Sequence, residues 1–264
     1  MSRRALWMAA VLAGGFVLGC RSDTPDAGRE AAGLKPLTYS RDPFYHRLDC
    51  GELEPCVKLV LPRLVLADTQ AVARRIDAWL FELMMAGLPL RKSEFKSRET
   101  YADSLFAHYQ QLKGVKRARP WAVRVQWEVD RNDGVFFSGR LLQEAYLGGA
   151  HGLPSIRTFC VERRTGRNLP LDSILLPEHR STFGREAQQK FVAKYEVRGR
   201  PPDFRAAGFW FENNRFRLPA HFVLKDGGLE LIYNVYEVAP YSEGVLRIRF
   251  GEEELQPFLR PAYR

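Results

Sequence analysis

The alternation of apolar and polar residues changes along this chain and predicts both strands and helices. From residue 121 to residue 129, Trp or Val occupies every second position and the positions between them are mostly polar. This period of two is typical of a strand with one buried face. The turn residues Asn132-Asp133-Gly134 follow, and residues 135–146 are again rich in apolar side chains. Residues 121–146 therefore predict a β-hairpin.

Other segments follow the same two periods. Apolar residues recur at helical spacing over residues 72–87, 101–112 and 181–195. Further strands are expected at residues 57–66, 155–162, 216–224, 229–238 and 245–250, and a short acidic helix at 252–259. Strands joined by turns, with helices grouped between them, predict an α+β fold of antiparallel sheets and packed helices. No β-α-β alternation calls for a parallel sheet.

Residues 1–19 have the pattern of a signal peptide. Arg3 and Arg4 precede an apolar run from Ala5 to Leu18, which is too short for a membrane-spanning helix of the mature protein. The run ends in Val17-Leu18-Gly19-Cys20, which resembles the lipobox of bacterial lipoproteins. This resemblance implies cleavage before Cys20 and acyl chains, such as palmitate, on the cysteine. Ordinary signal-peptidase cleavage or an uncleaved anchor is the alternative, and either still exports the chain.

The residues after Cys20 bear on where the protein lies. Residues 20–37 are polar and small and predict a flexible tether behind the lipidated cysteine. Arg21 stands where an aspartate would favour retention in the inner membrane, so the outer membrane, facing the periplasm, is the expected location in the cell envelope. The full chain carries a net charge of +9. Outside the cytoplasm this charge favours anionic polymers or lipid head groups over nucleic acid as partners.

Three cysteines remain once Cys20 is set aside. Cys50 and Cys56 flank a short, turn-rich loop in an oxidising compartment, so we expect a disulfide between them. Cys160 lies between Phe159 and Val161 in a predicted strand, where a buried free thiol behaves as a small apolar side chain. No spacing of Cys and His suggests a metal site, and no cofactor motif is present.

Three motifs together resemble a known architecture: Tyr146 to Gly152 (YLGGAHG), Thr165 to Asp172 (TGRNLPLD) and Tyr233 to Gly244 (YNVYEVAPYSEG). Their order and spacing resemble the exported region of RsiV-like anti-sigma factors. The resemblance implies two adjoining modules, a PdaC N-terminal-like module at 38–147 and an RsiV-type C-terminal module of unknown function at 148–264. It also implies a protein ligand, such as a lysozyme, or a cell-wall ligand.

Two loops hold the candidate binding residues. Gly149 and His151 lie in the glycine-rich loop, whose glycines allow a close approach of the backbone. Pro240 and Tyr241 lie in the third motif, where the tyrosine could anchor a partner. Each loop has a structural alternative, a tight turn that only packs.

Two functions remain open at this point. The first is a non-catalytic envelope lipoprotein that binds a protein or peptidoglycan. The second is a peptidoglycan hydrolase or deacetylase that uses His151 together with an acid such as Asp172 or Glu237. The sequence favours the first, because it contains no recognised catalytic set.

The lipobox makes a direct prediction. Cys20→Ala should abolish lipid attachment, because the acyl chains are carried by that sulfur and its amino group. Metabolic labelling with a clickable palmitate should mark the wild type and a Cys160→Ala control, but not Cys20→Ala. Equal labelling of all three proteins would contradict the lipoprotein assignment.

Overall fold

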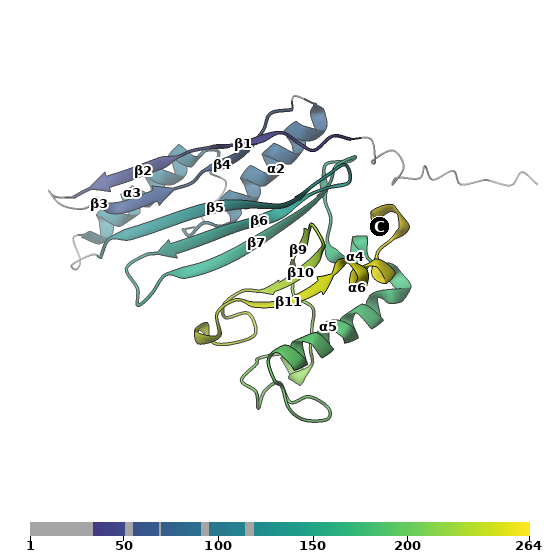
Figure 1. Cartoon of the computed structure of the whole chain (residues 1–264). Coiled ribbons are helices and arrows are strands. Elements are labelled where there is room, and N and C mark those ends of the chain that lie inside the picture. The colour runs from purple at the N-terminus through teal and green to yellow at the C-terminus, as the bar shows by residue number, and fades with distance from the viewer. Residues whose placement is uncertain (1–33, 51–54, 69, 91–94, 114–118) are drawn as a thin grey trace, which may run out of the picture.

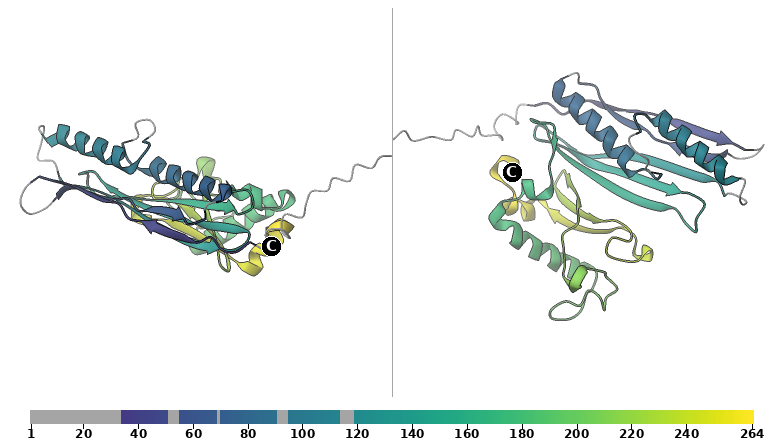
Figure 2. Two further views of the ribbon diagram at one scale, coloured as in Figure 1. Left: turned by 90° about the horizontal axis from the view of Figure 1, so that it is seen from above. Right: turned by 180° about the vertical axis from the view of Figure 1, so that it is seen from behind.

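A computed structural model of the 264-residue chain describes residues 34–50, 55–68, 70–90, 95–113 and 119–264. The predicted signal peptide, Cys20 and most of the tether lie outside the described residues. The described chain begins and ends at the same end of the molecule (Figures 1 and 2). Its elements form mostly antiparallel sheets with packed helices, so the predicted α+β class is confirmed.

The largest sheet has six strands in the order β2-β3-β5-β6-β7-β8. These strands are β2 (Tyr45–Asp49), β3 (Pro55–Val60), β5 (Trp121–Asn132), β6 (Phe136–Tyr146), β7 (Leu153–Glu162) and β8 (Arg167–Asn168). The predicted hairpin is present as the antiparallel pair of β5 and β6. The module boundary expected at 147/148 falls in the connection between β6 and β7, and these two strands pair along ten residues each.

The N-terminal part of this sheet differs from the expectation. The strand expected at 57–66 is divided at Pro62, which follows β3 and precedes β4 (Arg63–Leu66). β4 pairs with β1 (Tyr39–Asp42), and neither β1 nor β2 was predicted. β3 and β5 run parallel, because α2 (Ala71–Gly87) and α3 (Arg98–Lys113) carry the chain back across the sheet between them.

α2 and α3 cover one face of the six-stranded sheet, as the view from above shows (Figure 2). Their apolar stripes, Ile76, Leu80 and Met84 on α2 and Tyr101 and Leu105 on α3, are buried. The alternate residues of β5 face these helices, and Trp127 also donates a hydrogen bond from its indole to the Pro62 carbonyl. Burial of each large apolar side chain contributes roughly 1.5–3 kcal/mol, so this interface stabilises the first core.

A second core forms around a three-stranded sheet in the order β11-β10-β9. Its strands are β9 (His221–Lys225), β10 (Gly228–Tyr233) and β11 (Leu246–Gly251). α5 (Arg180–Lys194) packs on one face through Phe183, Ala187 and Phe191. The short helices α4 (Leu171–Ile174) and α6 (Glu252–Leu255) lie at the end of this sheet near the C-terminus (Figure 1). The same half of the chain contains the 3₁₀ turns η1 (Pro177–His179), η2 (Glu212–Asn214), η3 (Tyr241–Glu243), η4 (Gln256–Phe258) and η5 (Pro261–Tyr263).

Strand β9 joins the two sheets. Two of its backbone N–H groups donate to side chains of the large sheet, Leu224 to Ser138 on β6 and Phe222 to Thr158 on β7. Ile156, Val223 and Ile232 form a small apolar cluster beside these bonds. A buried strand N–H needs a hydrogen-bond partner, and here the hydroxyl groups take the place of a neighbouring strand.

A buried ion network crosses the same joint. The side chain of Glu230 on β10 is only 1% exposed and lies within 4 Å of Arg140 on β6 and of Lys225, Arg247 and Arg249 of the small sheet. Burial alone would raise the pKa of Glu230. The hydrogen bond and charge of Lys225, with the charges of Arg140 and Arg247, outweigh burial and lower that pKa below its usual value.

Arg140 is the second charge of this network that lies deep in the joint. It pairs with Asp130 through two nitrogens and lies 3.2 Å from the carboxylate of Glu128. The hydrogen bond to Asp130 raises the pKa of Arg140 above its usual value. Both buried charges are therefore compensated, which their burial requires.

Glu230→Gln should lower the free energy of unfolding at neutral pH by about 3 kcal/mol, because it removes the buried carboxylate that Arg140, Lys225 and Arg247 share at the joint. The carboxylate pKa is lowered in the fold, so its contribution is complete above the unfolded value of about 4.3 and is lost as the pH falls through the lower, folded value. Denaturant unfolding at several pH values should show this acid-side loss in the wild type and a smaller loss in Glu230→Gln.

Glu253→Gln is the matched control for this experiment, because Glu253 is exposed at the start of α6. Its effect should stay within about 0.5 kcal/mol. Equal stability of the two variants would show that Glu230 does not hold the joint.

Candidate functional site

The two predicted loops meet in the structure, although they are separated by almost ninety residues. The rings of His151 and Tyr241 stack with their centroids 4.0 Å apart and an angle of 28° between their planes. The Tyr241 hydroxyl donates to the carbonyl of Gly152 at 3.1 Å. His151 is exposed and Tyr241 is half-buried. The structure thus brings His151 and Tyr241 together, while their role in binding stays a prediction.

Tyr236 completes a three-ring cluster with His151 and Tyr241. Its ring lies 5.7 Å from that of Tyr241, and its hydroxyl lies 3.5 Å from Nε2 of His151. Nδ1 of His151 is 2.9 Å from the Gly152 carbonyl, which can only accept, so Nδ1 carries the proton and Nε2 can accept from Tyr236 in the neutral ring. The backbone of Tyr236 has φ of 63°, an unfavourable value for a bulky residue, and its side chain is 48% exposed.

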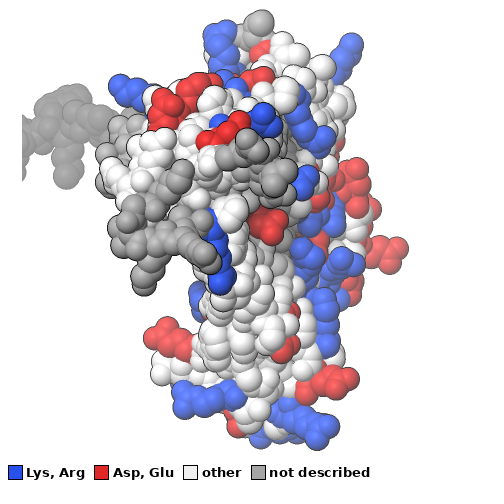
Figure 3. All heavy atoms as spheres, turned by 90° about the vertical axis from the view of Figure 1, so that its left-hand side faces the viewer, with Lys and Arg blue, Asp and Glu red and all other residues white. Residues whose placement is uncertain are grey.

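The surroundings of the ring cluster include the charged side chains of Arg119, beside Gly149, and Glu144, beside Gly152, as well as an exposed leucine. Leu153, two residues after His151, is 52% exposed at the start of β7. Figure 3 shows the end of the molecule at which the β6–β7 connection and the η3 loop lie, and the middle of this face is largely free of Lys, Arg, Asp and Glu. An exposed aromatic cluster beside an exposed leucine is suited to a partner that offers apolar or hydrogen-bonding groups.

Asn234 fastens the third motif to the large sheet. Its side-chain amide accepts from the Ile156 N–H at 2.6 Å and donates to the Ile156 carbonyl at 2.9 Å, so it replaces a neighbouring strand at the edge of β7. Its own N–H donates to the carboxylate of Glu237. Tyr233 is buried, and its hydroxyl donates to the Arg217 carbonyl. Much of the motif therefore holds the fold together.

The remaining predicted residues support the loops. Gly149 is exposed, and its carbonyl accepts from Arg119 at 3.3 Å. The neighbouring Gly148 has φ of 82°, which a glycine adopts without strain. Pro240 is half-buried and precedes η3, where its carbonyl accepts from Glu243. These contacts give both residues a structural role beside the ring cluster.

The geometry does not assemble the predicted catalytic pair. Asp172 lies in α4 and is paired with Arg180 at 3.9 Å, and Glu237 accepts from the Asn234 backbone. Among the described residues, neither acid has a recorded contact with His151. Within the same part of the chain no group of three or more His, Cys, Asp and Glu could hold a metal ion. None of the helices that the structure describes is long and apolar enough to cross a membrane.

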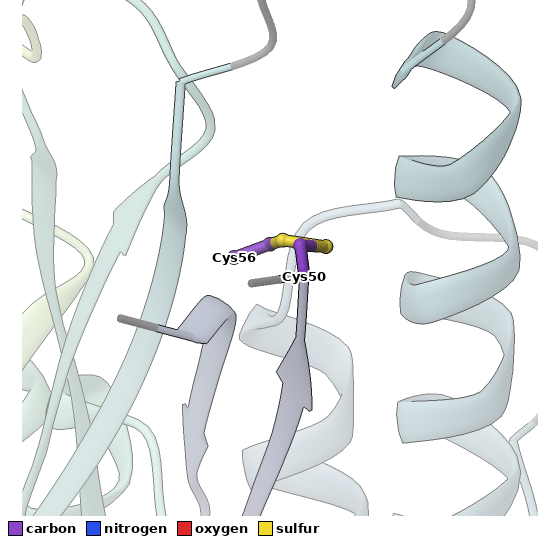
Figure 4. Close-up of a disulfide and its surroundings, with 2 residues drawn as sticks. All are labelled: Cys50 and Cys56. Atoms are coloured by element: carbon purple, nitrogen blue, oxygen red, sulfur yellow. A yellow bond between two sulfur atoms is a disulfide. The ribbon is translucent and has the colours of Figure 1, made fainter. Parts of the chain in front are cut away.

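The expected disulfide is confirmed between Cys50 and Cys56, at the end of β2 and within β3 (Figure 4). It closes the loop whose residues 51–54 lie outside the described part. Cys160 is free and buried, and burial raises the pKa of its thiol to about 12. The thiol is therefore protonated at neutral pH and packs as a small apolar group.

Comparisons with known proteins show a family domain within the second half of the chain. Residues 173–251 match a family model described as Protein of unknown function (DUF3298). A crystal structure of a DUF3298 family protein from Pseudomonas aeruginosa PAO1 has a TM-score of 0.61 and 22% identity, covering 87% of this chain and 97% of its own. One from Bacteroides fragilis NCTC 9343 has a TM-score of 0.63 and 16% identity, covering 86% and 94%.

These two likenesses concern the fold, because the identities are low. They extend the similarity from the matched segment to most of the chain. No curated protein matches the sequence. The chain therefore carries a DUF3298 domain, and the comparisons assign it no activity.

Asn234→Ala should lower the free energy of unfolding by about 2 kcal/mol, because the buried N–H and carbonyl of Ile156 lose their partners. Ser242→Ala is the control, since Ser242 is exposed in the same loop and should be nearly neutral. Thermal or denaturant unfolding measures both variants. Equal stability would mean that water replaces the amide at the edge of β7.

Proposed function

We propose that this chain is a lipid-anchored protein of the bacterial cell envelope that binds a protein or cell-wall ligand without catalysis. The binding surface is the ring cluster, defined as His151, Tyr236 and Tyr241. The observation that carries the proposal is that two loops far apart in the sequence bring these three rings together. The rings of His151 and Tyr236 are exposed, and Tyr236 has a strained backbone.

The ring cluster has the properties of an anchor rather than of a packed turn. Tyrosine offers a large apolar face and a hydroxyl at low entropic cost, which is why it is frequent among residues that dominate interfaces. Tyr236 leaves about half of its surface to solvent, and Tyr241 beneath it is held by Gly152. Tyr236 would contact the ligand, while Tyr241 would position Tyr236 and His151.

The absence of an assembled catalytic set supports the non-catalytic choice. A general base needs its partner within hydrogen-bond reach, and the contacts recorded for His151 are a carbonyl and two tyrosines. A hydrolase would need a carboxylate or nucleophile that the described residues do not bring to the ring.

The lipid anchor rests on the sequence alone. The lipobox-like segment at residues 17–20 lies before the described chain, which begins at Leu34. The DUF3298 match supports the predicted C-terminal module, and the likeness to RsiV-like exported regions adds the expectation of a protein or wall ligand. The outer membrane, facing the periplasm, is the proposed location.

Two defined probes test this function, purified peptidoglycan sacculi and lysozyme. The wild type should bind at least one of them, and Tyr236→Ala should weaken that binding about tenfold or more, as expected for an aromatic anchor. The melting temperature of the variant should not fall, since the substitution removes an exposed ring that makes few packing contacts. Cosedimentation with sacculi and surface immobilisation of lysozyme measure the binding.

Tyr45→Ala is the matched control, because Tyr45 is 58% exposed on β2. It should bind like the wild type. Failure of both probes to bind, or equal losses in the two variants, would contradict the proposal. Release of soluble fragments from the sacculi that His151→Ala abolishes would establish the enzymatic alternative.

A further inference from the structure

The segment from Tyr195 to Ala220 is a long connection with a fixed conformation. It runs between α5 and β9 and projects beyond α5 in Figure 1 and in the view from behind in Figure 2. Four of its phenylalanines pack within 6.0 Å of the ring of Phe191 on α5, namely Phe204, Phe209, Phe211 and Phe216. Asp203 and Asn214 tie the two halves of the connection by hydrogen bonds. These contacts fix which side chains face outwards.

Trp210 is the apolar side chain that this connection turns to solvent. It is 54% exposed although its neighbours Phe209 and Phe211 are buried. The backbone N–H of Trp210 donates to the backbone carbonyl of Val238 at 2.7 Å, which fixes the backbone at this position. Trp79, Trp121 and Trp127 are partly or fully buried, which leaves Trp210 as the exposed tryptophan of the described residues. An exposed indole on a fixed backbone is typical of a site that contacts a protein or a membrane.

Arginines surround Trp210 in the sequence of the same connection. All five are exposed, and within the described parts of the chain none is recorded in an ion pair; they are Arg198, Arg200, Arg205, Arg215 and Arg217. Of the three acids in the connection, Asp203 accepts hydrogen bonds from Ala206 and Asn214. The connection thus carries more arginines than acids, and it also contains the exposed indole of Trp210.

We propose that the Trp210 loop, defined as residues 198–217, contacts the surface of a bilayer that contains anionic phospholipid. Tryptophan favours the interface between head groups and acyl chains, and guanidinium groups bind phosphate through paired hydrogen bonds. The exposed Ala206, Ala207 and Gly208 before Trp210 carry no charge that would oppose contact with lipid.

Thirteen residues lie between Cys20 and Leu34, and an extended chain of that length reaches roughly 50 Å. A tether of this length would let the domain turn towards the membrane. The inference rests on the lipid anchor of the proposed function and is independent of the ring cluster. It adds a second membrane contact that would orient the domain, whereas the anchor alone would leave it free to turn.

Quenching of tryptophan fluorescence by lipids with brominated acyl chains tests the contact. The mature lipidated protein, which begins at Cys20 and therefore lacks Trp7, is reconstituted into vesicles of brominated phosphatidylcholine, with and without phosphatidylglycerol. We expect quenching that phosphatidylglycerol strengthens and that Trp210→Phe removes. Arg215→Gln/Arg217→Gln should weaken the contact about 25-fold, since each arginine near an anionic surface contributes about a factor of five. Its quenching in vesicles that contain phosphatidylglycerol should therefore fall below that of the wild type.

Lys58→Gln/Arg124→Gln is the matched control, because it removes the same charge from exposed positions on β3 and β5. It should keep the wild-type quenching. Equal losses in both double variants would overturn the proposal, because net charge would then explain them. Absent quenching in anionic vesicles would overturn it too, and so would a change of Trp210 emission with polyaspartate alone, which would point to an acidic protein partner.

Failure of the anchor would be visible separately. A chain without acyl groups would not float with neutral vesicles, and this would contradict the proposed lipoprotein. The same chain added to anionic brominated vesicles would still show whether Trp210 meets the lipid.

Discussion

The carboxylate of Glu230 is the charge on which the joint between the two sheets depends. It is buried beside β6 and β9, where four cations lie within 4 Å of it. The carboxylate is 1% exposed and needs these cations to stay charged, so the cluster favours the arrangement of the sheets that keeps Arg140 of β6 beside it. The hydroxyls of Ser138 and Thr158 add direction, because each accepts from one defined N–H of β9.

The fixed joint explains why the ring cluster can exist. His151 comes from the connection that follows β6, and Tyr236 and Tyr241 come from the connection between β10 and β11. Their rings meet only if the small sheet keeps its place on β6 and β7. Asn234, two residues before Tyr236, helps to keep the small sheet there, because its side-chain amide forms two hydrogen bonds with the backbone of Ile156 on β7. Structural and exposed residues thus alternate within one motif, and no single role describes it.

The sequence was a good guide where the pattern is local. The hairpin at 121–146, the three longer helices and the Cys50–Cys56 disulfide follow from period, turn residues and loop length, and all are present. The parallel pairing of β3 with β5 was missed, because two helices and β4 separate these strands. β1 and β2 were missed because their residues are mostly exposed and show no apolar period.

The site was harder to predict, because its key features are not periodic. The motifs pointed to His151 and Tyr241, but the positive φ of Tyr236 and the edge contact of Asn234 depend on tertiary contacts. Trp210 did not stand out in the sequence, because the phenylalanines on either side of it are buried. An exposed aromatic residue and a buried one look alike in the sequence when the segment is irregular, since no strand or helix period then assigns them to opposite faces.

The two exposed aromatic surfaces are coupled through one short backbone segment. The backbone N–H of Trp210 donates to the carbonyl of Val238, which lies between Tyr236 and Tyr241 in the chain. Val238 and the next residue, Ala239, are buried in the second core. A bilayer bound at Trp210 would therefore fix the direction in which Tyr236 faces. Rotation of the domain about a flexible tether spreads a binding surface over many orientations, and a second membrane contact would remove most of that freedom. A ligand held in the wall or on another envelope protein would then meet an ordered surface, so that less entropy is lost on binding.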